Sequence, residues 1–130
     1  MSTCPRLSSH TLPGARAGTQ LPSYDRSQLR TGIVHLGLGV FVRAHEALYT
    51  EDLLATEPFD WVMVGASLQR ADQRDRLLPQ DGLYTALECG SSGVSARIVG
   101  CVRSALFAPE DPVAVVDVWQ HWRPVSSVLL

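Results

Sequence analysis

Two glycines separated by one residue, Gly37 and Gly39, form the part of this sequence whose spacing could bind a phosphate group. They follow a short apolar run and precede a segment with helical spacing, the context in which a G-x-G pair carries meaning. The first glycine permits a sharp turn, and the second lets the backbone approach a pyrophosphate. The helix start that follows offers free N–H groups and a positive dipole end. The pattern predicts a dinucleotide-binding turn, with a plain strand-to-helix turn as the open alternative.

Two other parts of the dinucleotide fingerprint are incomplete or displaced. A third small residue usually lets the helix pack closely on the strand, and Val42 stands in its place. The ribose of NAD normally bonds a carboxylate about 20 residues beyond the glycines. The candidates in this chain, Asp72 and Asp75, lie farther along. A solvated, charged helix face is the interpretation that the pattern alone favours for both aspartates.

Other chemistry-bearing residue types are scarce. All 11 basic residues are arginine, and the chain has no asparagine, so a lysine amine or an Asn side chain is not available here. Cys4, Cys89 and Cys101 share no metal-ligand spacing, and we expect reduced thiols and no metal site. His35 lies inside an apolar run, where a hydrogen-bonded core residue is favoured over a ligand.

The glycine pair must be positioned by strands and helices that the hydrophobic pattern predicts. Buried parallel strands are indicated by short β-branched, apolar runs, and helices by apolar residues at 3.6-residue spacing. Proline, glycine and acidic residues mark the turns and helix starts. Strands are expected at residues 33–36, 61–65, 83–88, 95–103 and 125–130, and helices at 43–55, 71–78 and 109–119. This order predicts an α/β fold with a mostly parallel sheet and flanking helices.

The length of 130 residues allows one compact domain and is too short for two. Residues 1–30 are rich in Ser, Pro, Gly and Thr, and we expect an N-terminal arm that is partly disordered or wraps the surface. A net charge of −2 gives no electrostatic basis for binding nucleic acid or an anionic membrane. The apolar runs are strand-sized and no secretory signal begins the chain, so we expect a cytoplasmic protein.

The stretch from Gly37 to His45, GLGVFVRAH, resembles the G-x-G-x-F-H-R-A-H segment of the mannitol dehydrogenase and fructuronate reductase family. The resemblance covers roughly residues 22–118, and the stretch from Gln80 to Thr85 is its other specific part. It implies a truncated Rossmann-type domain, residues 31–118, that binds NAD(H). It also implies that the second, helical domain, which would bind a sugar alcohol or hexuronate, is absent from this chain. Such enzymes transfer a hydride between the nicotinamide and a CH–OH carbon.

Six cofactor-binding residues follow from the resemblance: Gly37, Gly39, Val40, Phe41, Arg43 and Asp72. For Arg43 a structural hydrogen bond at the helix start remains the alternative. Val42 replaces the family's usual His, and Gln69 replaces an Arg whose cation would lie near the adenosine, which argues against NADP. The family's general base is a lysine, so we expect no catalytic residue in this chain and no turnover.

Two rival functions remain beside the dehydrogenase interpretation. One is a non-catalytic nucleotide-binding module. The other is a methyltransferase-like enzyme, against which the F-x-R-A-H match argues. The resemblance fades near Asp117, and Trp119 and Trp122 are unusual where the family continues with an Ala/Leu-rich helix end. A reading frame shifted by two bases encodes such a run, so we expect residues 119–130 to be a frameshifted tail.

Overall fold

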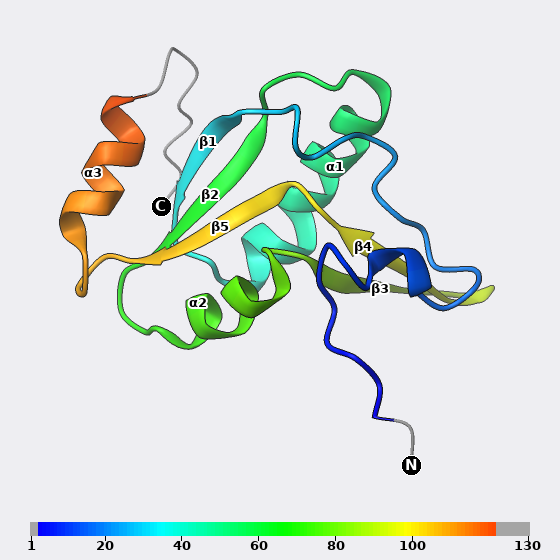
Figure 1. Cartoon of the computed structure of the whole chain (residues 1–130). Coiled ribbons are helices and arrows are strands. Elements are labelled where there is room, and N and C mark those ends of the chain that lie inside the picture. The colour runs from blue at the N-terminus through cyan, green and yellow to red at the C-terminus, as the bar shows by residue number, and fades with distance from the viewer. Residues whose placement is uncertain (1–2, 122–130) are drawn as a thin grey trace.

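The computed structural model describes residues 3–121, and its centre is a three-stranded parallel sheet (Figure 1). The strand order is β1 (Thr31–Leu36), β2 (Val62–Ser67) and β5 (Val102–Phe107). Val34 of β1 lies beside Val64 of β2. Every residue of β2 is buried, as expected of a central strand whose two faces are covered. The expected α/β fold with a parallel sheet and flanking helices is confirmed.

In the described part of the chain, three helices accompany the sheet: α1 (Ala47–Thr56), α2 (Asp72–Leu77) and α3 (Pro112–Gln120). A π-helical turn, η2 (Val42–Glu46), leads into α1, and single 3-10 turns occur at η1 (Leu12–Gly14) and η3 (Leu78–Gln80). Asp111 caps α3 by accepting the N–H of Ala114 at 2.9 Å. Within residues 3–121, none of the helices has the length and apolar character needed to cross a bilayer. The expected strand at 125–130 and residues 122–130 of the expected tail lie outside the described residues.

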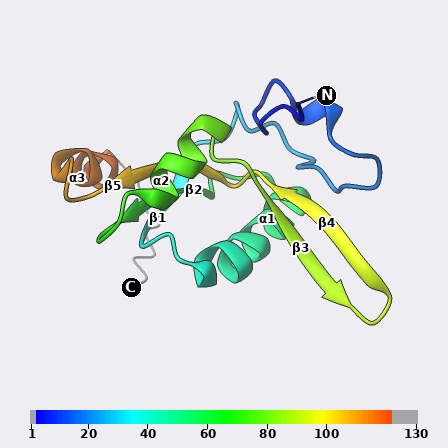
Figure 2. The same cartoon turned by 90° about the horizontal axis from the view of Figure 1, so that it is seen from below.

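The expected single strand at residues 95–103 is wrong, because the chain breaks there into two strands. Strands β3 (Tyr84–Gly90) and β4 (Gly93–Val99) form a separate antiparallel hairpin, and β5 begins only at Val102. The N–H groups of Gly100 and Cys101 donate to the Glu51 carboxylate at 3.0 and 2.9 Å. This contact turns the chain from the hairpin into the parallel sheet. The hairpin extends from the end of the molecule opposite α3 (Figure 2).

The segment before β1 lies along β4 and the β4–β5 turn. Gln20 makes an isolated parallel bridge to Arg97, donating to the Ala96 carbonyl at 3.0 Å. Arg26 donates to the Gly100 carbonyl at 2.8 Å. Leu29 is buried in the main core cluster. That cluster joins α1 to both sheets, and its fully buried members include Leu54, Met63, Val99 and Val102.

Candidate functional site

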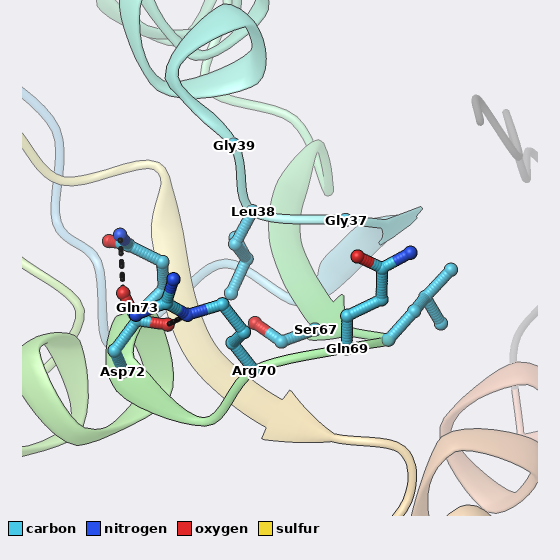
Figure 3. A pocket seen from close by; sticks show the side chains of 9 residues that line it. Gly37, Leu38, Gly39, Ser67, Gln69, Arg70, Asp72 and Gln73 are labelled. Atoms are coloured by element: carbon cyan, nitrogen blue, oxygen red, sulfur yellow. Dashed lines mark hydrogen bonds and ion pairs between the residues drawn. The ribbon is translucent and has the colours of Figure 1, made fainter.

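An open pocket of about 430 Å³ lies at the carboxyl ends of β1 and β2 (Figure 3). The glycine turn after β1 forms one side, and the segment from the end of β2 into α2 forms the other. The lining residues are Gly37, Leu38, Gly39, Ser67, Leu68, Gln69, Arg70, Asp72 and Gln73. In open α/β sheets, ligands bind in the crevice outside the carboxyl ends of the strands. The pocket therefore occupies the position expected of a nucleotide site.

The glycine turn has the geometry that the sequence predicts for close approach by a ligand. Gly37 adopts φ +104°, a left-handed conformation that favours glycine, and its N–H donates to the Ala66 carbonyl at 2.6 Å. A Cβ built at Gly37 or Gly39 would meet no protein atom within 4 Å. The helix begins at once, since the N–H of Arg43 already bonds the Gly39 carbonyl at 3.3 Å. Open backbone beside a helix start is an arrangement suited to an anion.

Val42 stands where the fingerprint has a small residue, but Gly65 of β2 allows the glycine turn to pack closely on the sheet. The Leu38 side chain is buried and packs with Leu77 and Ala105. A Cβ built at Gly65 would lie 2.0 Å from Leu38 Cδ2, so only glycine at that position lets the turn lie this close to the sheet. Val42 is itself buried in the main core cluster, which explains why an apolar residue is accommodated there.

Charged side chains occupy the α2 side of the pocket. The Asp72 carboxylate lies 3.4 Å from Arg70 Nε and accepts a long, 3.5 Å hydrogen bond from Gln73 Nε2. The Asp72 side chain is 36% exposed and that of Arg70 is 81% exposed. Exposed ion pairs of this kind contribute little to stability, so the carboxylate can exchange its partner for a ligand hydroxyl. Arg70 also places a cation in the pocket one residue beyond Gln69.

Three of the six expected cofactor residues have side chains outside this pocket. Val40 and Phe41 are more than 70% exposed, and the Phe41 ring lies 5.2 Å from the ring of His45. Arg43 donates through Nε to the Leu38 carbonyl at 3.0 Å, which is the structural hydrogen bond of the alternative interpretation. Val40 and Arg43 line a second, smaller hollow of about 180 Å³ beside β3. The pocket thus brings together Gly37, Gly39 and Asp72, and not the other three side chains.

Sequence reasoning missed several lining residues as site residues: Ser67, Leu68, Arg70 and Gln73. Gln69 was noted only as a departure from the family pattern. The signal that could have found them is their position directly after the second parallel strand, at the edge of the sheet where the glycine turn also lies.

Comparison with known proteins identifies the family. Residues 31–122 match the mannitol dehydrogenase Rossmann domain. Mannitol 2-dehydrogenase of Pyricularia oryzae is 43% identical over 105 residues, which cover 78% of this chain and 21% of the relative. The polyol:NADP oxidoreductase of Gluconobacter oxydans is 41% identical over 115 residues, which cover 85% of this chain and 24% of that protein.

A solved structure shares the fold as well as the sequence. Mannitol 2-dehydrogenase of Pseudomonas fluorescens, in a ternary complex with NAD and D-mannitol, superimposes with a TM-score of 0.81 at 35% identity. The match covers 87% of this chain and 24% of that one. The chain spans about a fifth to a quarter of the length of these relatives. On these matches the chain belongs to the mannitol dehydrogenase family, of which it contains the Rossmann domain.

Proposed function

We propose that this chain is the NAD(H)-binding part of an oxidoreductase that acts on the CH–OH group of a polyol or hexuronate. The observation that carries the proposal is the pocket between the glycine turn and α2, at the carboxyl ends of β1 and β2. The Pseudomonas fluorescens relative with bound NAD and D-mannitol supports it. Bound NAD(H) would supply the hydride chemistry, and this chain would hold and orient the dinucleotide.

In this proposal the two sides of the pocket hold different parts of the dinucleotide. Gly37 and Gly39 would hold the pyrophosphate, and Val40, Phe41 and Arg43, which follow in the first turn of the helix, would contribute to its binding. Asp72 would hold the ribose of the adenosine, and its carboxylate would repel a 2′-phosphate, which favours NAD over NADP. Arg70 supports NADP as the alternative, since it could move from Asp72 to that phosphate. Because Arg70 cannot contact Asp72 and a 2′-phosphate at the same time, the relative affinities of the chain for NAD and NADP would show which arrangement forms.

The substitution Gly39→Val tests the site directly. The new Cβ meets no protein atom within 4 Å, so the fold should tolerate it, while its methyl groups fill the space above the turn. We expect calorimetry to show NADH affinity reduced by roughly tenfold or more, equivalent to at least ~1.4 kcal/mol. Gly90→Val is the matched control, because its Cβ would meet only Ser92 Oγ, at 4.0 Å, and it lies in the hairpin. Equal affinity of the two variants would count against the site.

A second expectation separates binding from catalysis. We expect no NADH formation from NAD and mannitol above a no-protein control, because this chain contains no lysine for the general base that the family resemblance implies. Loss of a catalytic base alone typically lowers a rate by ~10²–10⁴. The remaining candidate, a non-catalytic nucleotide-binding module, makes the same prediction for this chain. Measurable turnover would contradict both and would require a base among the residues present.

A further inference from the structure

His35 connects the glycine turn to the helix that follows it. It lies in β1, only 7% exposed, and belongs to neither the pocket lining nor the expected cofactor residues. Its Nδ1 is 2.8 Å from the Gly37 carbonyl oxygen, and its Nε2 is 3.2 Å from Glu46 Oε2. Glu46 is the last residue of the π-helical turn η2, and its side chain is 19% exposed. One imidazole thus bridges the two segments that flank the proposed pyrophosphate position.

The hydrogen-bond chemistry of this bridge has a defined direction. A carbonyl oxygen only accepts, so Nδ1 carries a hydrogen and donates it to Gly37. Nε2 lies 3.2 Å from Glu46 Oε2, within hydrogen-bond distance, so both ring nitrogens have a protein partner. The His35 and Glu46 side chains are only 9% and 19% exposed, so this contact is mostly shielded from water.

The bond to Gly37 determines how the peptide between Gly37 and Leu38 is oriented. Carbonyl and N–H point in opposite directions across a trans peptide, so a carbonyl held toward His35 directs the Leu38 N–H the other way. Among residues 3–121, no protein group accepts a hydrogen bond from that N–H. Gly37 has φ +104° and no side chain, so this peptide could rotate readily if the carbonyl were released. A rotated peptide would present a carbonyl oxygen, which repels an anion, where the N–H attracts one.

We propose that His35 and Glu46 are positioning residues for the dinucleotide pyrophosphate, acting through the Gly37 carbonyl. This inference rests on the proposed NAD(H) binding and adds a specific cause for the shape of the turn. Glu46 holds the imidazole, and the imidazole holds the carbonyl. The backbone N–H of Leu38, a residue that lines the pocket, is thereby directed away from His35 and would be available to the phosphate. A merely space-filling role for His35 would need neither of its two hydrogen bonds.

The test compares NADH affinity and thermal midpoint for the whole 130-residue chain and four variants. His35→Phe keeps a ring but loses both bonds, and Glu46→Ala releases the imidazole at a position that is partly exposed. We expect both to bind NADH roughly tenfold more weakly. Glu46→Gln can still bond the ring through its side-chain amide, so we expect its affinity to return to within about twofold of the wild type. Glu57→Ala, at an exposed position just past α1, is the control and should bind normally.

The outcomes separate the positioning role from the proposed function. If the wild-type chain binds NADH and Glu46→Ala binds equally well, the positioning role is wrong and the NAD(H) site stands. If Glu46→Gln is as weak as Glu46→Ala, the hydrogen bond to His35 is not what matters, and the proposal is likewise overturned. Absence of NADH binding by the wild-type chain would overturn the proposed function together with this role. Because Glu46→Ala removes no core side chain, its result decides the matter even if His35→Phe fails to fold.

Discussion

Replacement of Glu51 by alanine is expected to lower the free energy of unfolding by roughly 3 kcal/mol, because each buried donor left without an acceptor costs ~1–3 kcal/mol. Glu51 belongs to α1 and is 3% exposed. Its Oε2 accepts hydrogen bonds from the Tyr24 hydroxyl at 2.8 Å and from the N–H groups of Gly100 and Cys101 at 3.0 and 2.9 Å. One carboxylate oxygen therefore joins the helix to the N-terminal segment and to the turn between the two sheets.

Tyr24 is the hydroxyl donor of this cluster. Burial, together with the neighbouring Glu51 carboxylate, raises the pKa of Tyr24 well above its usual range, so the hydroxyl stays protonated and continues to donate. Tyr24→Phe removes one of the three bonds and no backbone donor loses its acceptor. We expect it to cost about 1 kcal/mol, the usual contribution of a single hydrogen bond.

Urea denaturation of the Glu51→Ala and Tyr24→Phe variants measures both effects. The control is Glu57→Ala, which removes an exposed carboxylate just past the same helix and should leave the unfolding midpoint unchanged. A Glu51→Ala midpoint equal to that of the control would show that the turn at Gly100 and Cys101 is held by something other than Glu51.

Gly82→Ala is expected to destabilise the chain by roughly 4 kcal/mol, in the range reached only by severe substitutions. Two costs combine at this position. Gly82 adopts φ +77°, which disfavours a residue with a Cβ by ~1–2 kcal/mol. An alanine Cβ would also lie 2.0 Å from the Val102 carbonyl oxygen, which belongs to the backbone of β5 and cannot rotate away as a side chain could. The strand would have to shift, and β5 is paired with β2.

A second glycine of this chain separates the two costs. Gly18 has φ +86°, but a Cβ built there meets no atom within 4 Å. Gly18→Ala therefore carries the conformational cost without the collision, and we expect a loss of only ~1–2 kcal/mol. Thermal unfolding of both variants, followed by far-UV circular dichroism, gives the comparison. Similar losses at the two positions would mean that β5 can move away from Gly82 at little cost.

The sequence by itself determined the features of this protein that depend on a few neighbouring residues. β-branched, apolar runs predicted β1 and β2, and a glycine pair between strand and helix spacing predicted the turn at Gly37 and Gly39. The expected strand at 83–88 corresponds to β3, and the acid and prolines before α3 predicted its start. These predictions succeed because backbone conformation, helix capping and alternation of burial act over short distances along the chain.

The tertiary structure decided what depends on segments that meet only after folding. Gly65 accommodates the Leu38 side chain, and Glu51 accepts hydrogen bonds from a turn in another part of the chain. No local sequence pattern indicates either of these roles. The same is true of Arg70, which joins Gly37 in one pocket only because β1 and β2 pair in parallel. Pairing of distant strands is selected by the packing of the whole core, and a local pattern does not contain that information.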